Sequence, residues 1–251
     1  MLKRLFPRED LEEQLPGYGV DLLVILPFTR DFAQLPARQF LDMFVTGWFR
    51  PKQMVAGYDF SFGSGREGTL ETLRDWTAGK QIALDVLPPL RMGGEVVSSR
   101  RIRDLVLKGD VHGAELLLGR PFYLRGQVIH GAGRGKTIGV PTLNQTAFNE
   151  TLPPTGVYVS RVRSGEGEFG SVTNIGTNPT FESGNTIKIE SHILGAQIGD
   201  WERQTVDLEL IERLREEKKF SGIEDLKKQI QSDILKARAI YEKMDRSHHN
   251  Q

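Results

Sequence analysis

The chain has 251 residues, of which 38% are hydrophobic and 26% charged, as expected for a soluble globular protein with one large domain or two modest ones. Lysine plus arginine equals aspartate plus glutamate at 33 each, so net charge gives no indication of a nucleic acid or an anionic membrane as partner. The absence of cysteine excludes disulfides, thiolate zinc sites and cysteine nucleophiles, and suits a reducing cytoplasm. No apolar run reaches about 18 residues, so no transmembrane helix is expected, and the first residues do not read as a secretory signal.

Residues 20–118 alternate strand-like and helix-like segments. Residues 20–28 form a continuous apolar run, which is typical of a parallel strand covered on both faces. The segments that follow are helical at 35–49, 68–79 and 98–109, and strand-like at 53–57 and 81–89. This alternation predicts an open, mostly parallel sheet.

The pattern changes near residues 119–121, which we take as the domain boundary. Short β-rich runs follow, separated by turns that contain Gly, Pro and Asn, and they predict an antiparallel barrel or sandwich. A final helix is predicted after residue 222, because apolar residues recur there at spacings of three and four and form one stripe: Ile223, Leu226, Ile230, Ile234, Ala237, Tyr241 and Met244. This helix should pack on the barrel.

Residues 130–144, HGAGRGKTIGVPTLN, contain Gly135-Lys136-Thr137, which resembles the end of a phosphate-binding P-loop. The P-loop is rejected because His130 stands where that pattern needs Gly, and because Gly139 and Pro141 disfavour the helix that must follow.

The same segment still has features that suit a phosphate site. Its glycines allow backbone N–H groups to approach phosphates closely. Thr142 and Asn144 offer hard oxygen ligands of the kind that Mg²⁺ takes, together with water and substrate phosphates. The alternative is a Gly-rich hairpin with Pro-Thr at the start of a strand.

Glu190-Ser191-His192 lies in a predicted strand. Alternation sends Glu190 and His192 to one face and Ser191 to the other. A carboxylate that faces the barrel interior could act as general base for a substrate hydroxyl. The alternative is a pair of surface residues on an exposed strand face.

Five motifs follow one another in the second half of the chain: G-x-G-R-G-K-x-x-G-x-P-T-x-N, GVY, NIGTNPTF, ESHIL and LRxEKKF, followed by an amphipathic helix. In these motifs, their order and their spacing, residues 120 to about 245 resemble the riboflavin kinase module.

This resemblance implies roles for particular residues. Thr142 and Asn144 match the PTxN residues that bind Mg²⁺ and the ATP phosphates, and Glu190 matches the glutamate that takes the proton from the riboflavin 5′-hydroxyl. The other residues that it assigns to nucleotide or flavin binding are Gly133, Arg134, Gly135, Lys136, Pro141, Asn178 and Arg213, with Arg215 as the alternative to Arg213.

The first half resembles the adenylyltransferase module of bacterial bifunctional riboflavin kinase/FAD synthetase, through GVDLLVILPF, GYDFSFGSGREG, SSRRIR and GDVHGAELLLGRPF. The expected fold class is therefore α/β plus all-β. An incomplete Rossmann-like nucleotidyltransferase domain at 1–119 precedes a riboflavin-kinase antiparallel β-barrel with a C-terminal helix at 120–251. The residues that this match assigns to binding are Ser98, Ser99, Arg103, Asp59, Phe60 and Phe62.

Three departures from the family pattern are evident. None of the five histidines forms the H-x-G-H with which the adenylyltransferase module opens, Arg100 replaces the Thr of SSTRIR, and Asp200-Trp201 replaces a Tyr-Gly. Residue 1 lines up inside the module. We therefore expect that the sequence begins at an internal Met of a longer gene product; a truncated protein with a relic first module is the alternative.

The implied function is phosphorylation of riboflavin to FMN by Mg²⁺-ATP and, in the intact family, adenylylation of FMN to FAD. Two alternatives remain: riboflavin kinase alone, or a flavin- or nucleotide-binding regulator without catalysis. The expected partners are riboflavin, FMN and ATP, with no nucleic acid and no membrane. The oligomeric state is not predicted.

Overall fold

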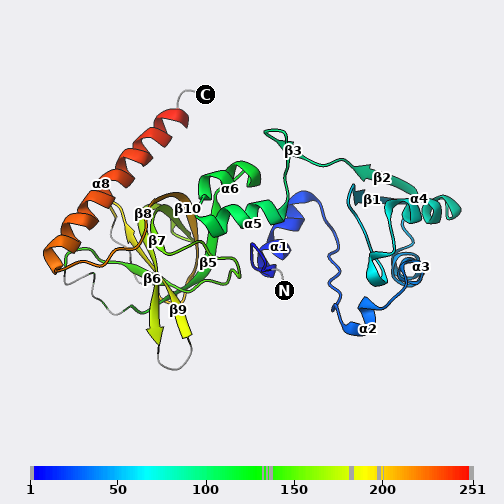
Figure 1. The fold of residues 1–251 in the computed structure, drawn as a ribbon, viewed down its shortest axis with the longest axis horizontal. Helices are drawn as coiled ribbons and strands as arrows, with labels where there is room; N and C mark the ends of the chain where they lie inside the picture. Colours follow the sequence, from blue (N-terminus) through cyan, green and yellow to red (C-terminus); the bar gives the residue numbers. More distant parts are fainter. Residues whose placement is uncertain are drawn as a thin grey trace. The chain divides into compact units, whose positions relative to one another are not determined.

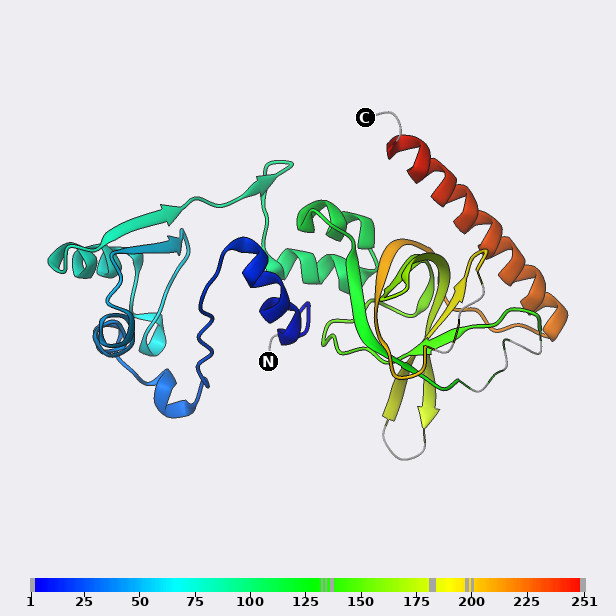
Figure 2. The same cartoon turned by 180° about the vertical axis from the view of Figure 1, so that it is seen from behind.

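The computed structural model describes residues 3–131, 133, 135, 138–180, 184–196, 199 and 201–248, without the side chains of 178–180, 184–186 and 245–248. The chain divides into two compact units, Met1–Gly19 with Ser98–Gln251, and Val20–Val97. Figure 1 labels their elements, and Figure 2 gives the view from behind. The predicted boundary at 119–121 lies inside the first unit.

The second unit is a small α/β structure. Its elements are α2 (Arg30–Ala33), α3 (Ala37–Phe40), the π-helix η2 (Leu41–Phe49), β1 (Gln53–Gly57), the 3-10 helix η3 (Ser64–Arg66), α4 (Leu70–Gly79), β2 (Ala83–Leu87), β3 (Arg91–Met92) and β4 (Glu95–Val96). The predicted parallel sheet is confirmed, because β1 and β2 pair in parallel. The helix predicted at 68–79 is α4, which begins after Thr69, whose hydroxyl accepts the N–H of Thr72. The buried core contains Leu41, Phe62, Leu73 and Trp76.

One expectation for this unit is wrong. Residues 20–28 were predicted to form a strand covered on both faces, but they form no strand and Leu22 is 68% exposed. An extended segment becomes a strand only when a neighbouring strand accepts and donates its hydrogen bonds. Among the described residues, β1 and β2 pair only with each other.

The first unit is built around a closed six-stranded barrel with the order β10-β5-β6-β9-β8-β7. The strands are β5 (Phe122–Ile129), β6 (Leu143–Gln145), β7 (Gly156–Ser164), β8 (Gly167–Thr180), β9 (Gly184–Ile193) and β10 (Thr205–Arg215). All neighbouring pairs are antiparallel, which confirms the predicted barrel. Side chains alternate between the interior and the outer face.

Helix α8 (Ile223–His248) covers part of the outer face. Ile234 and Ala237 of the predicted stripe are buried against Val157 and Val172. The Tyr241 hydroxyl donates to the Ser160 carbonyl, and burial raises its pKa to about 12, so the donor keeps its proton at neutral pH. The predicted packing of this helix on the barrel is confirmed.

Helices α1 (Arg8–Gln14), η1 (Leu15–Tyr18), α5 (Ser99–Lys108) and α6 (Val111–Leu118) complete the first unit. Arg125 of β5 joins α1 to the barrel, because its Nη1 lies 2.9 Å from Asp10 Oδ1 and its Nε 2.7 Å from Asp207 Oδ1. Burial raises the pKa of Asp10, and the Tyr123 hydroxyl donates to its carboxyl group. This hydrogen-bonded network keeps the first helix on the barrel.

We expect Gly126→Ala to destabilise the barrel by about 2–3 kcal/mol, because it overpacks a rigid contact. A Cβ at Gly126 of β5 would lie 1.8 Å from the Thr146 carbonyl oxygen. Gly165→Ala, in the turn between β7 and β8, is the control, since an added Cβ there meets nothing within 4 Å. Scanning calorimetry should show a lower melting temperature for G126A alone; equal melting of both variants would contradict this account.

Candidate active site

Three polar side chains form one row across the outer face of the barrel. In the register of the sheet, Glu190 of β9 lies opposite Asn144 of β6 on one side and opposite Asn174 of β8 on the other. Directly opposed residues of antiparallel strands point to the same face and lie close together. The barrel therefore brings a carboxylate and two amides together from three separate parts of the sequence.

The structure decides between the two faces that the sequence left open for Glu190. Ser191 points into the barrel, where it is fully buried, and Glu190 therefore lies on the outer face. The Ser191 hydroxyl lies 2.8 Å from Thr173 Oγ1. Glu190 and His192 share the opposite face, as the alternation predicted, and both line a cavity outside the barrel wall. The reason is the register of β9, which the sequence does not reveal.

Close backbone approach explains two glycines of the loop before β6. A Cβ at Gly131 would lie 2.2 Å from Asn144 Nδ2. A Cβ at Gly135 would lie 2.3 Å from the Val140 carbonyl oxygen and 3.3 Å from Thr142 Oγ1. Any larger residue would displace the two oxygen-bearing side chains that the sequence selects as metal ligands.

The first cavity, here called the loop cavity, has a volume of about 540 Å³ and lies beside this loop. Its polar wall contains Thr142, Asn144 and His192. Its apolar wall contains Val128, Ile129, Leu143, Ile193 and Trp201. Trp201 is buried and packs against Phe169 with ring centroids 5.2 Å apart, so the second residue of the Asp200-Trp201 pair that departs from the family's Tyr-Gly is part of the cavity wall.

The second cavity, here called the helix cavity, also has a volume of about 540 Å³ and is lined by the outer face of β7, β8 and β9, the segment after β10, and α8. Its apolar wall contains Val157, Val172, Phe220, Ile230 and Ile234. Asn174 and Glu190 supply polar groups. Gly135, Thr142 and His192 line both cavities, so the two meet beside the row of polar side chains.

Two ion pairs border the helix cavity. Lys188 Nζ lies 2.8 Å from Glu190 Oε1. Arg215 Nη2 lies 2.8 Å from Oδ2 of Asp233, which is only 1% exposed, and Gln229 donates to the same carboxylate. Because a buried carboxylate needs such partners, Arg215 links the end of β10 to α8.

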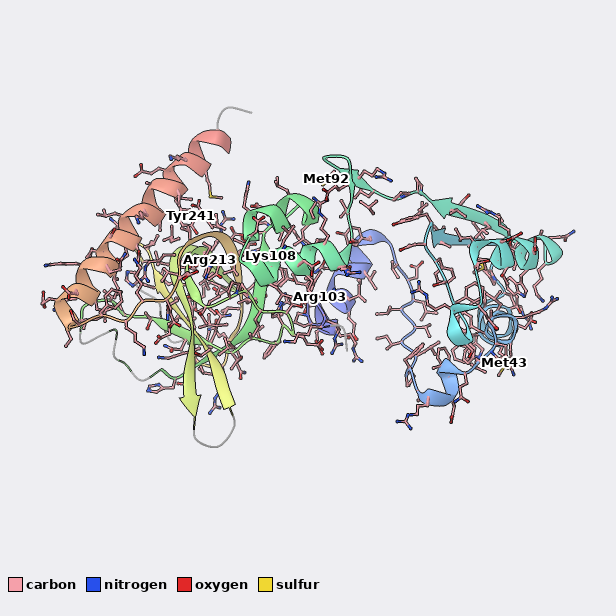
Figure 3. All side chains as sticks on the ribbon, in the orientation of Figure 1. Met43, Met92, Arg103, Lys108, Arg213 and Tyr241 are labelled. Atoms are coloured by element: carbon pink, nitrogen blue, oxygen red, sulfur yellow. The ribbon has the colours of Figure 1, made fainter. Side chains whose placement is uncertain are left out.

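Arg213 and Arg215 were the two candidates for a flavin-binding arginine, and only Arg215 lines the helix cavity. Arg213 donates from Nη2 to the Thr155 carbonyl at 2.8 Å. Figure 3 labels it on β10 near Lys108 of α5. Strand alternation places residues 213 and 215 on the same face, so it cannot distinguish them. A β-bulge between these two residues gives them different surroundings.

The other predicted residues of the barrel are distributed as follows. Gly133, Gly135 and Pro141 line the loop cavity, and the Pro141 carbonyl oxygen lies 2.9 Å from His192 Nδ1. Arg134 and Lys136 lie outside the described residues, and so does the side chain of Asn178. His192 was predicted to share a face with Glu190 but was given no role. Asn174 and Lys188 were not predicted, and the alternation around Glu190 was the available signal for Lys188.

The predicted residues of the first module fall in different units. Ser98 is the N-cap of α5 and accepts the N–H of Arg101, Ser99 begins that helix, and Arg103 donates from Nε to the Lys3 carbonyl at 2.7 Å. Asp59, Phe60 and Phe62 belong to the second unit, where the rings of Phe60 and Phe62 stack with centroids 5.3 Å apart.

The oxygen donors suit a magnesium ion that keeps most of its ligands as water and substrate phosphate. In the portion of the chain that the structure describes, no group of three or more histidine, aspartate or glutamate side chains is arranged to hold a metal. Thr142 and Asn144 provide one hydroxyl and one amide oxygen at the junction of the cavities. Mg²⁺ commonly takes few protein ligands and completes its octahedron with water and substrate phosphates. The residues present fit that kind of site.

Two family models match the chain. Riboflavin kinase (Flavokinase) matches residues 118–241, and FAD synthetase (FAD_syn) matches residues 1–101.

Individual proteins are similar over most of the chain. It is 34% identical to a bifunctional riboflavin kinase/FMN adenylyltransferase of Bacillus subtilis over 92% of its length and 73% of that protein. The Escherichia coli K12 protein of the same description is 35% identical over 89% and 71%. A solved structure from Streptococcus pneumoniae, described as a macrolide-efflux protein, has a TM-score of 0.84 at 32% identity and covers 93% of this chain and 75% of its own.

None of the described helices combines the length and the apolar character needed to cross a membrane. Matching family models cover both halves, and relatives above 30% identity are spanned over more than two thirds of their length. The chain therefore belongs to the bifunctional riboflavin kinase/FMN adenylyltransferase family.

Proposed function

We propose that the barrel transfers the γ-phosphoryl group of ATP to the 5′-hydroxyl of riboflavin. The observation that carries this proposal is the junction of the two cavities. Thr142 lines both cavities there, and Glu190 lies in the row of polar side chains on the outer face of the barrel. Two substrates in adjacent cavities meet at such a point with their reacting ends together. Phosphoryl transfer depends on this positioning and on charge neutralisation.

We assign ATP to the loop cavity. Its glycines allow backbone N–H groups close to the phosphates, and its apolar wall, which includes Trp201, suits a flat purine ring. Thr142 and Asn144 then face the phosphates at the end next to Glu190. Mg²⁺, held there by these two side chains, would neutralise the phosphate oxygens.

We assign riboflavin to the helix cavity. The aliphatic side chains of the barrel wall and of α8, together with Phe220, form an apolar slot that suits the tricyclic flavin ring. The ribityl chain then extends toward Asn174 and Glu190, whose amide and carboxylate are able to bind its hydroxyls. Arg215, fixed by Asp233, borders the same slot.

Glu190 is the proposed general base. It takes the proton of the 5′-hydroxyl while that oxygen forms a bond to the γ-phosphorus and the bond from phosphorus to the ADP oxygen breaks. Its cross-strand neighbours are Asn144 and Asn174. In this reading residues 120–251 are the kinase domain and residues 1–119 belong to the adenylyltransferase domain, in a cytoplasmic enzyme of flavin cofactor biosynthesis with riboflavin, FMN and ATP as its small-molecule partners.

The first test is chromatography of the flavins formed when the whole chain is incubated with riboflavin, ATP and Mg²⁺. We expect FMN as a product. FMN followed by FAD would add the second activity of the family to this chain, whereas FMN alone would restrict it to the kinase. A folded sample that binds flavin and forms neither product would contradict the proposal and favour the non-catalytic regulator.

Replacement of the base should separate catalysis from binding. Glu190→Gln keeps the shape of the side chain but cannot take a proton, so we expect kcat for FMN formation to fall about 10²- to 10⁴-fold while riboflavin binding is kept. Glu166→Gln, in the exposed turn between β7 and β8, is the matched control. Full turnover by E190Q would remove Glu190 from this role.

Loss of the hydroxyl at the cavity junction should affect the metal. In Thr142→Ala we expect the Mg²⁺ concentration for half-maximal rate to rise about tenfold or more, because a ligand or its orienting group is lost. Thr205→Ala, at the exposed start of β10, should leave it unchanged. An unaltered Mg²⁺ dependence in T142A would argue against ligation by Thr142.

A further inference from the structure

Lys188 is a charged residue of the helix cavity that the phosphoryl transfer described above does not use. It lies on β9 two positions before Glu190 and therefore on the same face. Its Nζ is 2.8 Å from Glu190 Oε1, and the two side chains are 29% and 26% exposed. Both line the cavity assigned to riboflavin.

A second carboxylate lies on the other side of this lysine. Gly176 of β8 is the cross-strand partner of Lys188. The side chain of Glu217 rests on that glycine, since a Cβ at Gly176 would lie 2.5 Å from Glu217 Oε1. Lys188 thus stands between Glu190 along its own strand and Glu217 across the sheet.

Among the residues that the structure describes, the charges that line the cavity balance only when Lys188 is present. Arg215 is committed to Asp233, since its Nε and Nη2 donate to the two carboxylate oxygens. The other described lining charges are Lys188, Lys218, Glu190 and Glu217. Without Lys188, the Glu190 carboxylate at the polar end of the cavity would lose its ion-pair partner.

This balance matters because of what the proposed reaction produces. Riboflavin is uncharged, whereas a phosphate monoester carries close to two negative charges at neutral pH. The new phosphate is attached at the oxygen that Glu190 contacts, so its free oxygens come next to the ammonium group that already lies against Glu190. A carboxylate alone at this place would repel the product.

We propose that Lys188 is the cation that allows the helix cavity to hold the phosphate monoester of FMN, and that it decides how tightly FMN is held relative to riboflavin. This inference rests on the proposed kinase function. The competing view is that the pair is an ordinary surface ion pair on a strand, which contributes little. In that case removal of the lysine would affect both flavins alike.

The test compares the KM for riboflavin with the competitive inhibition constant Ki of FMN, in the wild-type chain and in Lys188→Met. We expect Ki for FMN to rise about tenfold, as for loss of one attractive charge at a partly exposed site, and KM for riboflavin to stay within about twofold. The effect should shrink at high salt. An unchanged Ki, or equal changes in Ki and KM, would overturn the proposal.

The matched control is Lys227→Met. Lys227 is also paired with a glutamate, Glu224, at 3.2 Å, and the variant removes the same charge, but this lysine is not among the residues that line the cavity. We expect both constants to remain those of the wild type. A rise in Ki for FMN as large as in K188M would show that overall charge causes the effect, and would count against Lys188.

A second pair of variants keeps the proposal testable where K188M turns over too slowly for kinetics. Displacement of bound riboflavin by FMN, followed by flavin fluorescence, gives the relative affinity without catalysis. Glu190→Gln should tighten FMN binding because Lys188 is then unpaired, and K188M/E190Q should recover part of the affinity lost in K188M. No recovery would contradict the charge balance.

Failure of the kinase function gives a different result from failure of this inference. If the wild-type chain binds neither flavin, the proposed function falls and the inference with it. If it binds and phosphorylates riboflavin but K188M holds FMN as the wild type does, only the inference falls.

Discussion

The register between β6, β9 and β8 is the constraint on which the candidate site depends. A slip of one residue in β9 would turn Glu190 into the barrel and Ser191 out of it. Closure of the barrel prevents such a slip, because β9 is paired on both edges. Hydrogen bonds in the interior also fix the register. The buried Thr173 hydroxyl lies 2.6 Å from that of Ser160 and 2.8 Å from that of Ser191, and these hydroxyls are satisfied in this register.

The same register explains why the loop before β6 is rich in glycine. Asn144 can lie in the row beside Glu190 only if the incoming chain passes over it at close range, and the chain does so at Gly131. The three-residue strand β6 is therefore paired within the sheet and is also contacted by the loop that lines the loop cavity. Glycine at position 131 is needed for this close approach, independently of any anion that the loop binds, because a Cβ there would push the Asn144 side chain out of the row.

The sequence predicted the elements of the barrel and α8 well, because alternation and helical spacing are local signals. It could not give the face of Glu190, because alternation fixes relative sides and not which of them is inside. It overpredicted a strand at residues 20–28, where apolar character is local but strand formation requires a partner. It also left Arg213 and Arg215 unresolved, since the bulge that separates their surroundings depends on β7, more than fifty residues earlier.

The two cavities form one candidate site because several elements of the barrel and α8 contribute residues to it. The strand pairing supplies Asn144, Glu190 and Asn174, the loop supplies Thr142, and α8 supplies the apolar wall opposite. Arg215 and Asp233 connect that wall to β10, so the helix cannot move away without exposing a buried carboxylate. The width of the helix cavity is therefore set by a fixed ion pair, while its polar end is set by strand register. Under the proposed function, a flat flavin ring placed between them would be held by two independent constraints, with its free end at the junction beside Glu190. Such an arrangement would supply the positioning that phosphoryl transfer requires, and a barrel with an apolar outer wall would then direct a polar reaction to one point on its surface.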